Sequence, residues 1–156
     1  MKTRHMMMIA VFLVGMLCWL QGCSEKKVYR LSEGEKNTAG LSFPNFIEIR
    51  GIDGEGVENF ITRMIWEGQN EVRIPAGTHA VELRYNDIWD IDDNDHEKVT
   101  SRYILLEFNA QPHRTYKVAV DAPRDRESAH KLAAHFDPAI VDVRTGNTVS
   151  RFLQEE

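Results

Sequence analysis

The segment at residues 72–85 places the strongest constraint on what this chain can fold into. Apolar side chains occupy alternate positions on both sides of Pro75-Ala76-Gly77. A period of two is typical of a β-strand with one buried face. Proline lacks an N–H and glycine tolerates positive φ, so together they favour a tight turn. We therefore predict a β-hairpin, with His79 packed in its sheet. Val72 and Ile74 alternate with polar neighbours on the first strand, and one face of the next strand holds His79, Val81, Leu83 and Tyr85.

Further apolar runs have the length and composition of strands. Turn signals such as Asp53-Gly54 and Thr145-Gly146-Asn147 follow two of them,. We predict that two of the later runs form a second hairpin across residues 109–114. The predicted strands are residues 46–52, 60–66, 103–108, 116–120 and 140–143.

One segment changes from a period of two to the helical period. Ala129, Leu132, Ala133 and Phe136 fall at i, i+3, i+4 and i+7, which predicts one face of a helix,. Asp137-Pro138 ends it, because proline cannot continue a helix. We expect a helix of about three turns over one end of a sheet. The fold class is therefore mainly β: a small antiparallel β-sandwich with one short helix in the C-terminal half. Three hairpins on a single sheet would give a similar pattern.

The N-terminus has the layout of a secretory signal. Two basic residues precede an apolar run at residues 6–20. This run is too short for a comfortable transmembrane helix, which needs about 20 residues, but it fits the apolar region of a signal peptide. It ends in Leu20-Gln21-Gly22-Cys23, which resembles the lipobox of bacterial lipoproteins. The resemblance implies cleavage between Gly22 and Cys23 and acylation of Cys23.

The implied lipid predicts where the chain works. Several acyl chains anchor a protein firmly, since each buried methylene contributes about 0.8 kcal/mol. Ser24 follows the cysteine. A serine there resembles lipoproteins that are sorted to the outer membrane and face the periplasm. We expect a membrane contact through the N-terminal lipid alone.

These features divide the chain into three parts. Residues 1–22 are the predicted lipoprotein signal peptide, and residues 23–44 are the predicted lipidated N-terminus and tether. Residues 45–156 are the predicted β-sandwich domain. Within the tether, residues 28–31 could add a short edge strand.

The composition argues against several classes of function. A formal net charge of -5 does not suit a nucleic-acid-binding protein, which normally has a basic patch,. The sequence has no glycine-rich phosphate loop, no zinc-spaced cysteines and no nucleophile elbow. Ser101, Ser128 and Ser150 stand outside any catalytic motif,. We therefore expect no enzyme activity and no cofactor.

The most unusual segment is acidic, at residues 87–97. Asp90, Asp92 and Asn94 occupy positions 1, 3 and 5 of a loop like that of an EF-hand. Position 6, which needs glycine for a sharp turn, is Asp95, and the carboxylate position 12 falls on Ser101,. We predict a solvated acidic loop between strands that does not bind calcium tightly. A weak cation site would use Asp90, Asp92 and Asn94.

The order of these elements resembles a family of exported bacterial proteins. Residues 72–85 are similar to the central hairpin of the YccT-like proteins of Gram-negative bacteria. The resemblance continues through Ile104-Leu105-Leu106-Glu107-Phe108, Tyr116-Lys117-Val118-Ala119-Val120 and the helix at residues 127–136, covering about residues 46–149. Most of that family is uncharacterised. Resemblance to one branch implies a periplasmic protein that modulates the assembly of curli, the amyloid fibres of the cell surface.

Three functions remain open from the sequence. The first is a non-catalytic envelope lipoprotein that binds another envelope protein by strand addition and modulates assembly of a surface fibre. The second is a structural accessory lipoprotein of a secretion or envelope complex. The third is a domain that binds a cation or a glycan. Long exposed strand edges would favour the first, an exposed apolar patch the second, and a carboxylate cage or aromatic shelf the third.

Overall fold

The computed structural model describes residues 34–57 and 69–153. The predicted signal peptide, the lipobox at residues 20–23, and the strands predicted at residues 28–31 and 60–66 lie outside these residues. Among the described helices, none is long and apolar enough to cross a membrane.

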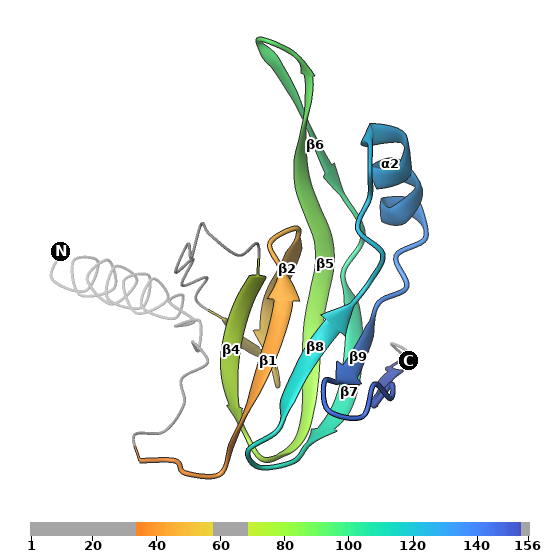
Figure 1. Cartoon of the computed structure of the whole chain (residues 1–156). Coiled ribbons are helices and arrows are strands. Elements are labelled where there is room, and N and C mark those ends of the chain that lie inside the picture. The colour runs from red at the N-terminus through yellow and green to blue at the C-terminus, as the bar shows by residue number, and fades with distance from the viewer. Residues whose placement is uncertain (1–33, 58–68, 154–156) are drawn as a thin grey trace, which may run out of the picture.

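The described chain is mainly β, with two sheets and one short helix (Figure 1). The first sheet has four strands. Their order is β4 (Gln69–Pro75), β1 (Thr38–Pro44), β8 (Thr115–Ala119) and β9 (Ala139–Asp142).

The second sheet is built around one very long strand, β5 (Gly77–Asp92). On one side β5 pairs with β7 (Ile104–Ala110), and on the other with β2 (Ile47–Ile52). The sheet ends in β10 (Ser150–Phe152) beside β7 and β3 (Glu55–Gly56) beside β2. A further strand, β6 (Asp95–Thr100), pairs with the second half of β5.

Both sheets contribute to one apolar core. Leu41, Ile74 and Ile140 of the first sheet belong to the same buried cluster as Val81 and Leu106 of the second. This sharing of a core between two sheets is the sandwich predicted from the alternating pattern. One pair departs from the antiparallel prediction, because β1 and β8 run parallel.

The two expected hairpins are wrong in their pairing. The turn at Pro75-Ala76-Gly77 joins β4 to β5, and the turn at residues 111–114 joins β7 to β8. In each case the two strands belong to different sheets. Gly77 has a φ of 138° and the N–H of Ala76 donates to the carbonyl of Asn37 at 2.7 Å. A tight turn between two strands of alternating pattern can form a hairpin within one sheet or a corner between two sheets. The local sequence pattern does not distinguish these two arrangements.

The predicted tether is also too long. Residues 38–44, which we assigned to it, form β1 between β4 and β8. Ala39 and Leu41 are buried there. Ala39, Leu41 and Phe43 alternate along this strand, a signal that the tether assignment overlooked. Gly40 lies so close to β4 that a Cβ on it would be 2.7 Å from the Oε1 of Glu71. The domain therefore begins about seven residues earlier than the boundary at residue 45.

The predicted helix is present as α2 (Arg126–Ala134). It begins at Asp125, whose side chain accepts from the N–H of Ser128 at 2.8 Å, while the Ser128 hydroxyl accepts from the N–H of Asp125 at 3.0 Å. This reciprocal cap satisfies N–H groups that a helix start leaves free. The expected face is the packed one: Ala129 is fully buried, and Leu132 and Ala133 pack beside it.

The acidic segment is a β-hairpin and not a loop. Residues 86–92 of β5 pair with residues 95–100 of β6 in antiparallel register. We call residues 86–100 the arm, and Figure 1 shows it projecting beyond the sandwich. Ile88, Trp89, Ile91 and Val99 are good strand formers, but the aspartates between them obscured the pattern,.

Candidate binding surface

The arm is tied to the core at its base through Tyr85. This residue is fully buried, and its hydroxyl accepts the indole N–H of Trp89 at 2.8 Å. The N–H of Tyr85 donates to the Ser101 hydroxyl at 3.0 Å, and that hydroxyl donates to the carbonyl of Arg102 at 2.8 Å. Burial also raises the pKa of Tyr85 above its ordinary value. The arm therefore starts from a rigid root and not from a hinge.

Helix α2 braces one face of the arm. Val99 of β6 and Tyr85 form a small second core with Ala129 of the helix. Above it, Glu97 pairs with His130 at 3.1 Å and with Arg126 at 3.7 Å. Both ion pairs are half exposed, so each contributes little alone. Together with the small core, they hold the lower part of the arm against the helix.

The upper part of the arm has no such cover in the described structure. Ile88 is 65% exposed and Ile91 is 46% exposed. Side chains of this size are usually buried, so these two mark candidate contact points on the arm.

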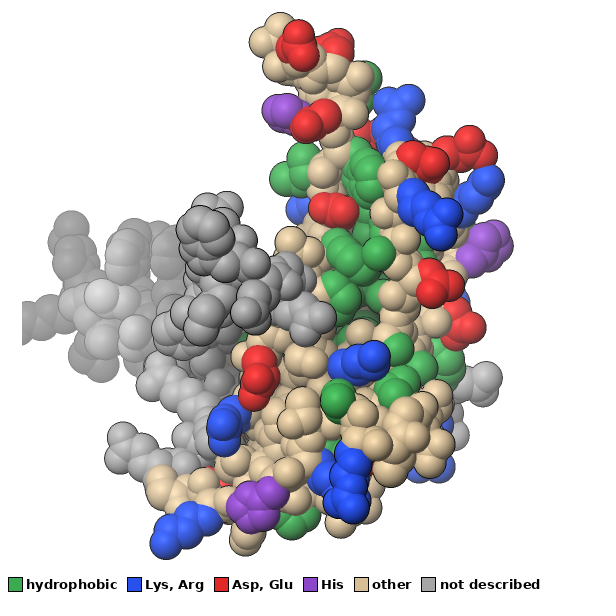
Figure 2. Space-filling model, in the orientation of Figure 1, with side chains coloured by type: hydrophobic (Ala, Val, Ile, Leu, Met, Phe, Trp, Pro, Cys, Tyr) green, Lys and Arg blue, Asp and Glu red, His purple; other side chains and the backbone are tan. Residues whose placement is uncertain are grey.

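The arm is also strongly acidic. Its 15 residues hold six carboxylates against a single lysine, Lys98. Acidic side chains gather at its free end in Figure 2. The arm thus combines exposed apolar groups with concentrated negative charge.

Both long edges of the arm lack a neighbouring strand among the described residues. On one side, β6 pairs only with β5. On the other, the pairing of β2 with β5 ends at Ile47 and Tyr85, and the N–H of Asn86 donates to the carbonyl of Phe46 at 2.9 Å. An unpaired edge is a template for strand addition.

The three candidate cation ligands do not converge. Asp90 pairs with His96 at 2.7 Å, and the carboxylate of Asp92 accepts from the N–H of Asn94 at 2.9 Å. The Asp92 contact shapes the turn at the end of the arm. Within residues 34–57 and 69–153, no group of three or more His, Cys, Asp or Glu side chains is placed to hold a metal ion.

Comparison with known proteins identifies a family. Residues 40–154 match the family described as "Uncharacterized protein conserved in bacteria (DUF2057)". The chain belongs to this family. No curated protein and no solved structure matches it.

In this DUF2057 chain, sequence reasoning missed a polar network at the root of the arm. Glu48 of β2 accepts the Tyr103 hydroxyl at 2.6 Å, the Arg84 Nε at 2.9 Å and the amide of Asn86 at 2.7 Å. The guanidinium groups of Arg50 and Arg84 lie 4.9 Å and 4.5 Å from the centre of the Tyr103 ring. The sequence signal for this network is the alternation of acidic and basic residues along two strands. Which residues face each other depends on the register between β2 and β5, which the sequence alone does not give.

The network changes the acidity of its members. Burial alone would raise the pKa of Glu48, but the hydrogen bonds from Tyr103 and Arg84 outweigh it and lower that pKa,. Burial raises the pKa of Tyr103, and its bond to Glu48 raises it further. The contacts of Glu48 join β2 to β5 and to Tyr103, so this cluster braces the sheet where the arm leaves it.

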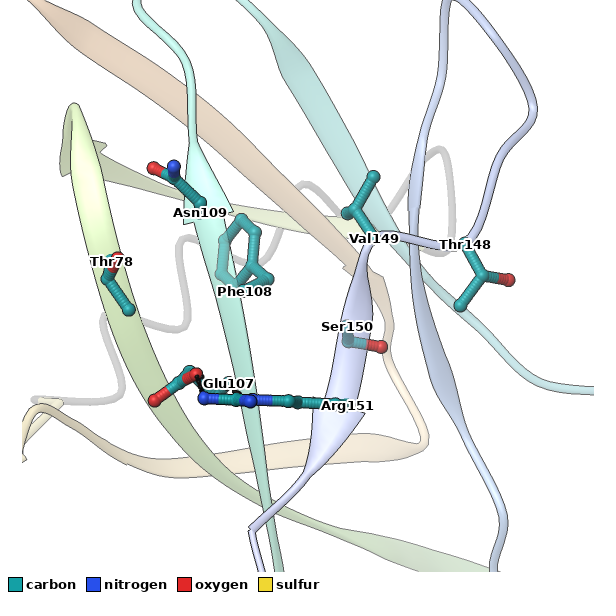
Figure 3. A pocket seen from close by; sticks show the side chains of 8 residues that line it. All are labelled: Thr78, Glu107, Phe108, Asn109, Thr148, Val149, Ser150 and Arg151. Atoms are coloured by element: carbon teal, nitrogen blue, oxygen red, sulfur yellow. Dashed lines mark hydrogen bonds and ion pairs between the residues drawn. The ribbon is translucent and has the colours of Figure 1, made fainter.

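A shallow groove lies elsewhere on the DUF2057 domain, beside β10. Its volume is about 310 Å³, and Figure 3 shows the ion pair of Glu107 and Arg151 across it. The hydroxyl of Ser150 accepts the N–H of Ile140 at 2.8 Å, so it holds two strands together. The lining residues are Thr78, Glu107, Phe108, Asn109, Thr148, Val149, Ser150 and Arg151.

His79 packs in the sheet, as its position in the alternating pattern predicted. It is 6% exposed. Its Nδ1 lies 2.7 Å from Asp53 and its Nε2 lies 2.9 Å from the carbonyl of Pro75. The ring therefore connects the β2–β3 turn with the corner between the sheets.

Proposed function

We propose that this chain is a lipid-anchored protein of the bacterial envelope that binds another envelope protein through its arm and catalyses no reaction. The anchor rests on the lipobox-like residues 20–23, which predict acylation of Cys23 and an outer-membrane position facing the periplasm. The binding role rests on the arm.

The projecting arm is the observation that carries this proposal. A two-stranded ribbon is marginally stable in water unless something else covers it. Here the root is braced by Tyr85 and α2, while Ile88 and Ile91 stay exposed. Covering such a side chain contributes about 1.5–3 kcal/mol. A partner seated on the arm would recover that free energy.

The roles of the serine hydroxyls support a binding protein over an enzyme. Ser101 bonds within the root of the arm, and Ser128 caps α2. Ser150 joins β10 to β9. Each hydroxyl already has a structural partner, and none of these hydrogen bonds is to a histidine base, which would activate a nucleophile,.

The finer form of the proposal concerns the partner. The resemblance to YccT-like proteins suggests an amyloid-forming surface subunit. An arm edge bound to the last strand of a growing ladder would leave no free edge for the next subunit. The arm would then slow fibre assembly instead of templating it.

Site-specific crosslinking in the native envelope tests the proposal. A photoreactive amino acid replaces Ile88 or Ile91 on the arm, and matched control positions use Val143 and Phe152, which are 51% and 50% exposed. We expect one envelope protein to be captured from the two arm positions and not from the two controls. Equal capture from all four positions, or capture from the controls alone, contradicts the proposal.

A further inference from the structure

The two edges of the arm differ in the residues whose backbone N–H and C=O groups point toward them. The hydrogen bonds at the base of the arm show which residues these are. The N–H of Ser101 donates to the carbonyl of Tyr85 at 3.1 Å, on the side of β6 and β7. The N–H of Asn86 donates to Phe46 at 2.9 Å, on the side of β2. Alternate residues of a strand direct their backbone polar groups to opposite sides. The backbone N–H and C=O groups of Ile88 and Asp90 therefore point to the same side as those of Asn86, along the edge that continues beyond the start of β2.

The edge of β5 continues an existing sheet, whereas β6 pairs with β5 alone and packs one face against α2. A strand added to β5 at residues 88–90 would extend the side of the sheet on which β2 lies, and beyond Asp90 the register of β5 with β6 shifts. In the free chain, the N–H of Ile88 is donated to the carboxylate of Asp87 at 2.9 Å. This local contact shields the edge without pairing it, and a carbonyl of an added strand would replace it.

The charges around this edge select its occupant. Asp90 already pairs with His96, and Glu97 with residues of α2. Asp92, Asp93 and Asp95 remain at the free end with no ion pair in the described structure. A second copy of the arm would set acid against acid, which is destabilising across strands, while a basic segment would be favoured.

We propose that the β5 edge at residues 88–90 takes up an extended peptide segment rich in lysine or arginine as an added strand. The backbone groups of Ile88 and Asp90 pair with the segment, and the carboxylates at the end of the arm attract its basic side chains. This inference rests on the proposed function and deepens it, because it names the edge and the chemistry of the partner.

Amide hydrogen exchange of the full chain in detergent micelles tests the edge directly. The probe is a ten-residue peptide of alternating lysine and valine, and the control peptide carries glutamate in place of lysine. We expect the basic peptide to slow exchange at Ile88 and Asp90 at least tenfold and to leave Lys98 unchanged. Protection confined to His96 and Lys98, no protection, or equal protection by the acidic peptide overturns the proposal.

Two proline variants provide a matched comparison. Proline is tolerated at a strand edge where its missing N–H faces away from the ladder. Ile88→Pro removes an N–H from the β5 edge, and Lys98→Pro removes one from the β6 edge. With both variants folded by circular dichroism, we expect peptide affinity to fall at least tenfold in Ile88→Pro and less than twofold in Lys98→Pro. The reverse order overturns the proposal, and exchange in the unmodified chain decides it should either variant unfold.

The two sets of results separate the two proposals. Crosslinks from Ile88 and Ile91 without peptide protection would leave the arm as a binding surface and remove strand addition. Peptide protection without crosslinks in the envelope would retain the edge chemistry and remove the proposed function.

Discussion

The indole N–H of Trp89 donates to the hydroxyl of Tyr85 at 2.8 Å, joining the exposed arm to the buried sheet. The two residues lie four apart on the same face of β5,. One lies in the region where β5 pairs with β2, and the other lies where it pairs with β6. This single bond spans the boundary between the sandwich and the arm.

Removing the acceptor in Tyr85→Phe should destabilise the chain by about 1 kcal/mol, because a buried hydrogen bond is lost with little change in shape. Urea unfolding measures the change. Trp89→Phe and the double variant complete a cycle, and we expect the effects of the two single changes to be non-additive. Strict additivity would show that the bond does not couple the arm to the core.

The stability conferred by Glu48 should depend on pH. Its folded-state pKa is lowered from 4.5, so its contribution is fully present above pH 4.5 and is lost as the pH falls through the folded-state value,. Glu48→Gln should therefore be less stable than the unmodified chain at pH 7. The difference between their free energies of unfolding should become smaller toward pH 3. Urea unfolding at both pH values measures it.

Glu82→Gln is the matched control for that experiment. Glu82 pairs with Arg50 at 3.0 Å on the same sheet, but the arginine is 59% exposed. Exposed pairs contribute about 0–1 kcal/mol, so this variant should show a small change at either pH. If the difference in free energy of unfolding between Glu48→Gln and the unmodified chain is the same at both pH values, the charge of Glu48 is not the stabilising feature.

Cys23→Ala should block acylation and cleavage, because the cysteine supplies the sulfur to which the lipid is joined. The precursor should accumulate at its full length and lose labelling by a radioactive fatty acid. Immunoblotting of membrane fractions follows the size and position of the chain. A variant that is processed and fractionates like the unmodified chain would show that the lipobox interpretation is wrong.

Calcium should not bind tightly to the arm. The aspartates lie along a β-hairpin, and Asp90 is engaged by His96. Titration calorimetry with calcium chloride should give no dissociation constant below about 10 μM, the range of sensor EF-hands. A tighter constant that disappears in Asp92→Asn would establish a cation site that the free chain does not preform.

Fibre growth tests the finer form of the proposed function. The full chain in detergent micelles, added to an amyloid-forming surface subunit, should lengthen the lag and slow growth at substoichiometric ratios, because capped ends cannot extend. Added salt should weaken the effect if the subunit segment is basic. Unchanged kinetics at equimolar protein would remove the fibre-modulating role and favour an accessory lipoprotein. Empty micelles are the control, read by a dye that reports fibre mass.

Local features of this protein were readable from the sequence because they depend on neighbours in the chain. The alternation at residues 79–85 predicted the buried face of β5, and the spacing from Ala129 to Phe136 predicted the packed face of α2. Asp53-Gly54 is a turn, and the turn predicted at Thr145-Gly146-Asn147 lies at residues 143–145, overlapping it at Thr145,. The turns depend on the backbone preferences of their residues. The strand and the helix depend on the spacing of apolar residues, with a period of two for the strand and 3.6 for the helix.

Features that depend on distant partners were decided by the tertiary structure alone. Pro75-Ala76-Gly77 has the chemistry of a hairpin, yet β4 pairs with β1 and β5 with β2, so the turn becomes a corner. Residues 38–44 alternate at Ala39, Leu41 and Phe43, but this short pattern does not show that the segment pairs between β4 and β8. The arm is a different case, because β6 follows β5 directly, yet the aspartates at residues 87–95 are compatible with a loop until the β5–β6 register is known. A strand is completed by hydrogen bonds to another segment, and local sequence does not encode which segment that is.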